Sequence, residues 1–149
     1  MIAILTLRYL SGAEMSDKKH TGGCMCGAIR YELEGESPWS VYCHCKSCRK
    51  HTGAPVAALV AGPPDQVRWT SGDRALYEFS PGRFRAFCRD CGTSLTWEAE
   101  VNGSWLAIHI STFDNPEDLP PTEHVFHGDA IPWFDIGDDL PRHEGSKYI

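Results

Sequence analysis

Alternating apolar and polar residues along the chain predict β-strands. Ile29, Tyr31 and Leu33 alternate with charged neighbours, a period of two that gives a strand one dry face and one wet face. No long segment of the sequence shows a persuasive 3.6-residue period. The pattern therefore predicts a mainly β protein with few and short helical turns.

The clearest local prediction is a β-hairpin. The segments SLTWEAEV (94–101) and SWLAIHI (104–110) flank Asn102-Gly103, the dipeptide favoured in two-residue hairpin turns. In the second segment, Leu106, Ile108 and Ile110 share one face of the predicted strand, whereas His109 lies on the other face. We expect His109 to face solvent.

Further strands are expected where apolar runs end at turns rich in Gly and Pro, such as GPPD and SPGR. These runs are VAALVA (56–61), QVRWT (66–70), ALYEF (75–79), RFRAF (83–87) and HVFHG (124–128). Two short helical turns are expected, one near residues 46–51 and one in NPEDLP (115–120).

The chain has the length of one domain: 149 residues, 42% of them hydrophobic, are enough to bury a core. We place this domain at residues 21–144, after a flexible N-terminal extension (1–20) and before a C-terminal tail (145–149). Met15 begins a polar run typical of a natural N-terminus, so residues 1–14 are either a loose extension or no part of the native protein.

Charge and hydropathy exclude two classes of partner. The formal charge of −6 and the pI near 5.6 argue against nucleic acid, because phosphate contacts need a clustered basic face. The apolar opening MIAILTLRYL is too short to cross a bilayer and has no basic leader, so no membrane partner is expected. We expect a cytoplasmic protein that binds small molecules or proteins.

The seven cysteines indicate metal binding. They stand at positions 24, 26, 43, 45, 48, 88 and 91, in C-x-C and C-x-x-C clusters whose odd total does not suit a disulfide framework. Two alternatives remain, namely clustered buried thiols and a redox-active pair at Cys88 and Cys91. Neither alternative accounts for all seven thiols as well as metal sites do.

Ligand counting divides the seven thiols into four and three. Structural zinc sites take four protein ligands, whereas catalytic sites take three and leave one position for water or substrate. Two pairs each end in a glycine that allows a tight turn, and together they predict a closed site that ties the start of the domain to its middle. This predicted site consists of Cys24, Cys26, Cys88 and Cys91.

The remaining cysteines form the trio Cys43, Cys45 and Cys48, for which the chain has no fourth cysteine. An external thiol that binds at the open position would be deprotonated by the metal and become a nucleophile at neutral pH. The competing interpretation is that a histidine closes the trio into a second structural site. The candidates are His44, His51, His124 and His127, and strand alternation disfavours the first of them.

A basic cluster lies beside the trio, at Lys46, Arg49, Lys50 and His51. Arg and Lys next to an open thiophilic metal would hold an anionic thiol by its carboxylates. The alternative is an ordinary solvated face.

Five segments carry a family resemblance: GGCMCGAIRYEL, VYCHCKSCRKHTGAP, FCRDCGTSL, ISTFDNPEDLPPTEHVFH and IPWFDIGDDLPRHE. Together they resemble the glutathione-dependent formaldehyde-activating enzyme family, which shares its domain with centromere protein V. The resemblance runs from about Thr21 to Glu144. It implies a β-tent fold of antiparallel sheets with two zinc ions, one structural on the four-cysteine set and one catalytic on Cys43, Cys45 and Cys48.

The resemblance also implies a carbon–sulfur lyase of the S-(hydroxymethyl)glutathione synthase type, which adds glutathione to formaldehyde or a related small aldehyde. Arg49, Lys50 and Thr52 are the candidate residues for holding glutathione. Met25 departs from the family pattern, which often has histidine there, but it lies at the structural site. A noncatalytic, zinc-stabilised binding module is the alternative function.

Overall fold

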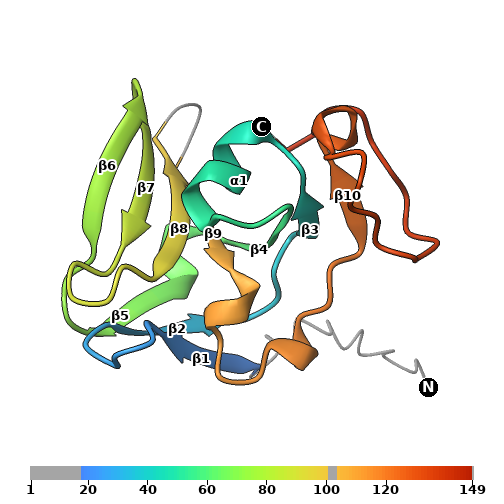
Figure 1. Cartoon of the computed structure of the whole chain (residues 1–149). Helices are drawn as coiled ribbons and strands as arrows, with labels where there is room; N and C mark the ends of the chain where they lie inside the picture. The colour runs from blue at the N-terminus through green and yellow to red at the C-terminus, as the bar shows by residue number, and fades with distance from the viewer. Residues whose placement is uncertain (1–17, 101–103, 149) are drawn as a thin grey trace, which may run out of the picture.

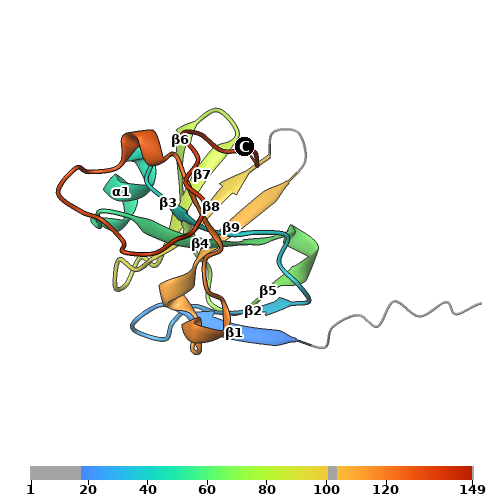
Figure 2. The same cartoon turned by 90° about the vertical axis from the view of Figure 1, so that its right-hand side faces the viewer.

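The computed structural model describes residues 18–100 and 104–148, which form two β-sheets and a few short helices (Figure 1). The smaller sheet has the strand order β1-β2-β5 and lies below the larger sheet in both views (Figures 1 and 2). Its strands are β1 (Lys19–Gly23), β2 (Arg30–Glu34) and β5 (Val67–Ser71). The prediction of a mainly β fold is confirmed.

The larger sheet has seven strands in the order β10-β3-β4-β9-β8-β7-β6. They are β3 (Ser40–Cys43), β4 (Ala57–Gly62), β6 (Ala75–Ser80), β7 (Arg83–Phe87), β8 (Ser94–Ala99), β9 (Trp105–His109) and β10 (Glu123–Val125). One helix, α1 (Lys46–Thr52), follows β3. The 3-10 turns are η1 (Pro64–Gln66), η2 (Ile110–Thr112), η3 (Pro116–Asp118) and η4 (His127–Asp129).

Most of the predicted elements are confirmed within one or two residues at each end. The pair β8 and β9 is antiparallel, with Ala99 opposite Trp105, as the hairpin prediction requires. The Asn102-Gly103 turn itself lies outside the described residues. The antiparallel prediction is wrong at one place, because β10 pairs with β3 in parallel.

Two strands, β1 and β3, had no sequence prediction. β1 has the sequence KHTGG, which lacks the apolar alternation of a strand. It forms because β2 offers a paired edge, and because Gly22 leaves room for the Tyr31 hydroxyl, which any Cβ would strike. The ordered strand therefore begins at Lys19, two residues before the expected domain boundary at residue 21.

The larger sheet carries one apolar core on each of its faces. Tyr31 and Leu33 of β2 pack with Val60, Leu106 and Ile108 of the larger sheet, so the first core lies between the two sheets. The second core includes Val41, Leu59, Trp97, Ala107 and Val125, on the face that α1 and the C-terminal segment cover (Figure 1). The two groups of cysteines therefore belong to different cores.

The C-terminal segment returns to the larger sheet. The Tyr148 ring stacks on Trp39 with centroids 5.2 Å apart, and its hydroxyl donates a hydrogen bond to Glu123. Residues that the sequence assigned to a tail thus pack on the second core. No helix in the described part of the chain is long and apolar enough to cross a membrane.

Candidate metal centres and the adjoining pocket

The first cysteine group lies in two tight turns. Cys24 and Cys26 occupy the turn between β1 and β2, and Cys88 and Cys91 occupy the turn between β7 and β8. The four sulfur atoms lie within 4.8 Å of one another, as ligand counting predicted for these residues. Hairpins that belong to different sheets are therefore joined at this point.

The backbone of both turns supports the sulfur atoms. Gly27 and Gly92 have φ angles of 80° and 75°, in the left-handed region that glycine adopts without strain. The Ile29 amide donates a hydrogen bond to Cys24 Sγ at 3.2 Å. The prediction that these glycines permit tight turns is confirmed.

The donor set fits zinc. A tetrahedral zinc ion with Zn–S bonds of about 2.3 Å places its sulfur ligands about 3.8 Å apart. The Cys24 and Cys26 sulfur atoms are 3.5 Å apart, and those of Cys26 and Cys88 are 3.9 Å apart. Four soft thiols at this spacing match a structural zinc site.

The trio converges at the junction of β3 and α1. Cys43 ends β3, Cys45 is the N-cap residue of α1, and Cys48 is buried in the first turn of the helix. Their sulfur atoms lie within 4.8 Å of one another. The Cys48 amide donates to Cys45 Sγ at 3.3 Å, so the helix start itself positions one sulfur.

The three thiols influence one another's pKa. Hydrogen bonds from Cys43 and Cys48 lower the pKa of Cys45 well below the usual thiol value. The hydrogen bond with Cys45, followed by that with Cys48 and by burial, raises the pKa of Cys43. A deprotonated Cys45 at the helix N-terminus is the form in which a thiol binds metal.

No histidine joins either cysteine group among the described residues. His44 is buried on a different side, where its Nε2 donates to His124 Nδ1 at 2.8 Å, and His124 Nε2 donates to Asp138 at 3.0 Å. Burial, followed by repulsion from His124 and His127, lowers the pKa of His44 to about 4. This buried chain fixes the loop between Cys43 and Cys45 and keeps His44 out of the trio.

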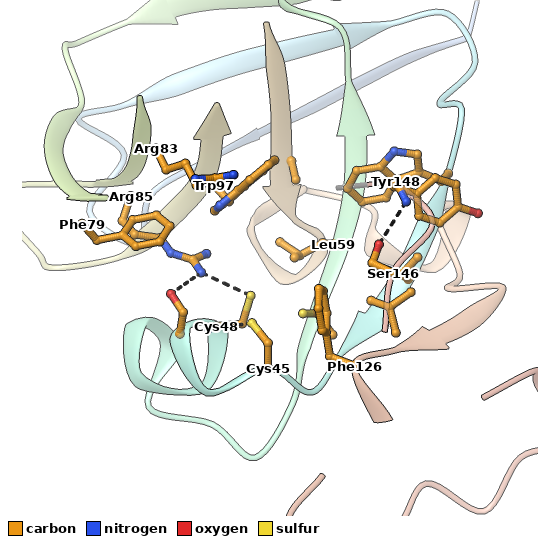
Figure 3. A pocket seen from close by; sticks show the side chains of 16 residues that line it. Cys45, Cys48, Leu59, Phe79, Arg83, Arg85, Trp97, Phe126, Ser146 and Tyr148 are labelled. Atoms are coloured by element: carbon orange, nitrogen blue, oxygen red, sulfur yellow. Dashed lines mark hydrogen bonds between the residues drawn. The ribbon is translucent and has the colours of Figure 1, made fainter. Parts of the chain in front are cut away.

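A cavity of about 170 Å³ opens on the trio (Figure 3). Its walls come from all seven strands of the larger sheet, from α1, and from the C-terminal segment. Besides the three cysteines, it is lined by Trp39, Val41, Ser47, Leu59, Phe79, Arg83, Arg85, Trp97, Ala107, Val125, Phe126, Ser146 and Tyr148. The trio is therefore a wall of a mostly apolar pocket.

Arg85 is the charged residue inside this pocket that sequence reasoning missed. It is only 4% exposed, and its Nη2 donates to Ser47 Oγ at 2.8 Å and to Cys48 Sγ at 3.4 Å (Figure 3). Its guanidinium lies 5.0 Å from the centre of the Phe79 ring. The sequence signal was RFRAF, in which alternation puts Arg83 and Arg85 on one face of a strand.

The residues expected to hold glutathione lie around the outer side of α1. Arg49 and Lys50 line a separate hollow of about 510 Å³ with Lys46 and the exposed Trp133. The Thr52 hydroxyl donates to the carbonyl of Cys48 at 2.9 Å. None of Arg49, Lys50 and Thr52 lines the pocket that the trio borders, and their binding role stays a prediction.

His109 was predicted to face solvent, and this prediction is wrong. It is 5% exposed, and its ring centroid lies 5.5 Å from that of His51. Burial, followed by repulsion from His51 and Arg85, lowers the pKa of His109 to about 3. The face of β9 that carries His109 is covered by α1, so both faces of this strand are buried.

Comparisons with known proteins agree with this geometry. The sequence model of the family described as "Glutathione-dependent formaldehyde-activating enzyme" matches residues 19–129. An uncharacterized lyase of Schizosaccharomyces pombe, C29B12.13, is 31% identical over 107 residues, which cover 64% of this chain and 75% of that protein.

A Rhodobacter sphaeroides protein with a crystal structure superimposes with a TM-score of 0.56 at 24% identity, over 70% of this chain and 99% of that one. This likeness shows a shared fold. The family match spans most of the domain and includes all seven cysteines. The chain belongs to the glutathione-dependent formaldehyde-activating enzyme family.

Proposed function

We propose that this protein is a zinc-dependent carbon–sulfur lyase that joins a thiol, glutathione in the first instance, to formaldehyde or a related small aldehyde. The observation that carries the proposal is the trio: three sulfur atoms converge at a pocket wall, and the described residues offer no fourth ligand. A site of three ligands has a position left for a substrate. The family membership and the lyase name of the yeast relative support an enzyme.

The two cysteine groups have different tasks in this proposal. Cys24, Cys26, Cys88 and Cys91 would hold a structural zinc ion, and Cys43, Cys45 and Cys48 would hold a catalytic one. When bound at the trio, zinc supplies Lewis acidity that keeps an incoming thiol in its thiolate form near neutral pH.

The residues around the trio would balance its charge and stabilise the charge that develops on the substrate. Arg85 contacts Cys48 and brings a buried positive charge beside the three thiolates, which offsets part of their negative charge. Ser47 of α1 accepts a hydrogen bond from the guanidinium, and most of the side chains that line the pocket are apolar. Charge that develops on an aldehyde oxygen in this pocket would be stabilised by Arg85 more strongly than in water.

The proposed step balances without a redox partner. The substrate sulfur forms a bond to the aldehyde carbon, and the electron pair of the C=O π bond moves to the oxygen. The thiol proton leaves to solvent, and the oxygen takes a proton from solvent. The product is a hemithioacetal, and the lyase reaction is the reverse.

The basic cluster on the outer side of α1 is proposed to hold the carboxylates of glutathione. Arg49 and Lys50 line one hollow, and Thr52 is at the end of the same helix. Arginine and lysine suit carboxylate binding. We further propose a cytoplasmic location, because none of the seven cysteines, all of which lie within the described residues, forms a disulfide.

NMR exchange spectroscopy on mixtures of glutathione and formaldehyde tests the proposal. We expect the zinc-loaded protein to accelerate exchange over the spontaneous rate, and Cys45→Ser to remove the acceleration. A rate equal to the spontaneous one, with both metal sites filled, would contradict the enzyme. Such a result would favour the alternative of a noncatalytic, zinc-stabilised module.

A further inference from the structure

The pocket beside the trio is larger and more apolar than formaldehyde requires. Leu59 and Trp97 of the larger sheet line one side and Tyr148 another (Figure 3). Ala107 of the sheet and Trp39, which stacks on Tyr148, belong to the lining as well. Formaldehyde carries only hydrogen atoms on its carbonyl carbon, so these walls gain nothing from binding it. Apolar walls stabilise a ligand by removing its apolar surface from water.

The strand register builds this wall. Arg85 lies opposite Trp97, and Trp97 lies opposite Ala107, so the three side chains share one face of the sheet. Across the sheet Ala107 lies between Trp97 and Ala61, and its small side chain leaves room that the cavity occupies. The cavity therefore depends in part on the small side chain at Ala107.

A strained residue completes the wall opposite Arg85. Phe126 has a φ of 52°, and it is the one residue other than glycine in the described ranges with a positive φ. Its amide donates to the carbonyl of Gly145 at 2.9 Å, so the C-terminal segment holds this conformation in place. Strained backbone conformations cluster at functional sites, and here the ring of Phe126 lines the pocket (Figure 3).

The charges in the pocket favour a neutral ligand. Three thiolates on a dication leave a net negative charge, and the buried Arg85 offsets it. The other cation of the lining, Arg83, is exposed to solvent. No carboxylate belongs to the lining within the described part of the chain.

We propose that the carbonyl substrate is an aldehyde with an apolar aromatic or aliphatic substituent, which fills this pocket beside the trio. The inference rests on the proposed function and narrows its substrate class. The substrate sulfur bonds to the aldehyde carbon, the C=O π pair moves to the oxygen, and solvent supplies that oxygen's proton. Arg85 stabilises the charge on the oxygen, and the substituent lies against Leu59, Trp97 and Phe126.

Kinetics with glutathione and two aldehydes, formaldehyde and phenylacetaldehyde, provide the first test. The rate enhancement over the spontaneous reaction is measured for each aldehyde, because this ratio cancels their different intrinsic reactivities. We expect the enhancement to be at least about tenfold larger for phenylacetaldehyde, the discrimination that a hydrophobic pocket can supply. Ala107→Leu fills part of the cavity and should reduce that ratio about tenfold or more.

Tyr148→Ala gives a second variant in case Ala107→Leu does not fold. It opens one wall at the C-terminal segment, and we expect the ratio to fall severalfold. Tyr77→Ala is the matched control, because Tyr77 is 63% exposed on β6 and does not line the pocket.

Equilibrium binding gives a readout that is independent of catalysis. 2-Phenylethanol is a neutral, unreactive analogue of the aldehyde, and Trp39 and Trp97 in the wall report its binding by fluorescence. We expect saturable binding at least about tenfold tighter than that of ethanol, and its loss in Ala107→Leu.

The outcomes separate the inference from the function. Equal enhancement for both aldehydes, or a larger enhancement for formaldehyde, would overturn the inference and leave the proposed function standing. Acceleration with neither aldehyde would overturn both. The tenfold preference together with tight 2-phenylethanol binding would support both.

Discussion

The two cysteine groups differ in solvent exposure and in the number of sulfur atoms that they offer, and exposure alone would not show which group has a position left for a substrate. The four-cysteine group is near the surface, with Cys26 exposed and the adjacent Met25 83% exposed. The trio has no exposed member, because Cys43 and Cys48 are buried and Cys45 is partly exposed; the first group has two buried members as well, Cys24 and Cys88. The first group nevertheless offers four sulfur atoms, as many as a tetrahedral zinc site takes, and the trio offers three.

Whether a metal site has an open coordination position therefore depends on how many ligands the chain offers and on which side chains surround them. Two turns between paired strands supply the four sulfur atoms of the first group. One helix start and one strand end surround the trio, and the remaining side is a cavity beside Arg85. A structural site and a reactive site can therefore be built from the same ligand type.

The largest expected effect distinguishes the two groups by stability. Cys88→Ser removes one ligand from the site that joins the two sheets, and we expect it to lower the free energy of unfolding by at least about 3 kcal/mol. Urea unfolding monitored by circular dichroism, with metal content measured in parallel, checks this. Unchanged stability would show that the first site has no structural role.

Cys45→Ser should affect metal content and activity more than the fold. We expect the metal content to fall from about two ions per chain to about one, because the trio loses a ligand. Serine is a good N-cap residue, so α1 should persist, and the loss of stability should be less than half that of Cys88→Ser. Mass spectrometry and unfolding on the same samples measure both quantities. An equal loss of stability would make the trio a second structural site.

The buried pair His51 and His109 should make stability depend on pH. Burial lowers the pKa of His109 to about 3, whereas the unfolded value is 6.5, so below pH 6.5 the unfolded chain takes up a proton that the folded protein does not. The stability from the neutral ring is present above pH 6.5 and is lost as pH falls towards 3.

His109→Gln should remove the part of this pH dependence that His109 contributes. We expect the loss of unfolding free energy between pH 6.5 and 4 to be smaller than in the wild type by up to about 1.4 kcal/mol per pH unit. Urea unfolding at several pH values measures the slope. His20→Gln, near the edge of the smaller sheet, is the control, and equal slopes in His109→Gln and wild type would contradict the prediction.

The smallest expected effect concerns the support of the first group. The Thr93 hydroxyl accepts a hydrogen bond from the Met25 amide at 3.1 Å and donates to Cys91 Sγ at 3.1 Å. Thr93→Val removes both bonds, and we expect a loss of about 1 kcal/mol. Thermal unfolding compares it with Thr70→Val, an exposed strand position. Equal effects of the two variants would show that the hydroxyl does not support the site.

The spacing of residues in the sequence determined much of this protein. The four-plus-three division of the cysteines, the glycine turns and the strands with alternating residues are all readable locally. Two ligands with one or two residues between them converge when a tight turn or a helix start joins them. The meeting of the two pairs of the first group is the exception, because Cys26 and Cys88 are 62 residues apart in the sequence.

The tertiary structure alone decided which surfaces meet. Arg85 borders the trio because β7 aligns with β8 across the sheet, and His109 is buried because α1 covers its face. β1 forms because the next strand, β2, offers it an edge, and β3 forms because β4 and β10 pair with its two sides. β10 comes from far along the chain and pairs with β3 in parallel. The pocket also needs the C-terminal segment to return, and the sequence has no local signal for that. Contacts between residues far apart in sequence depend on strand order and register, so the spacing of residues within one segment cannot reveal them.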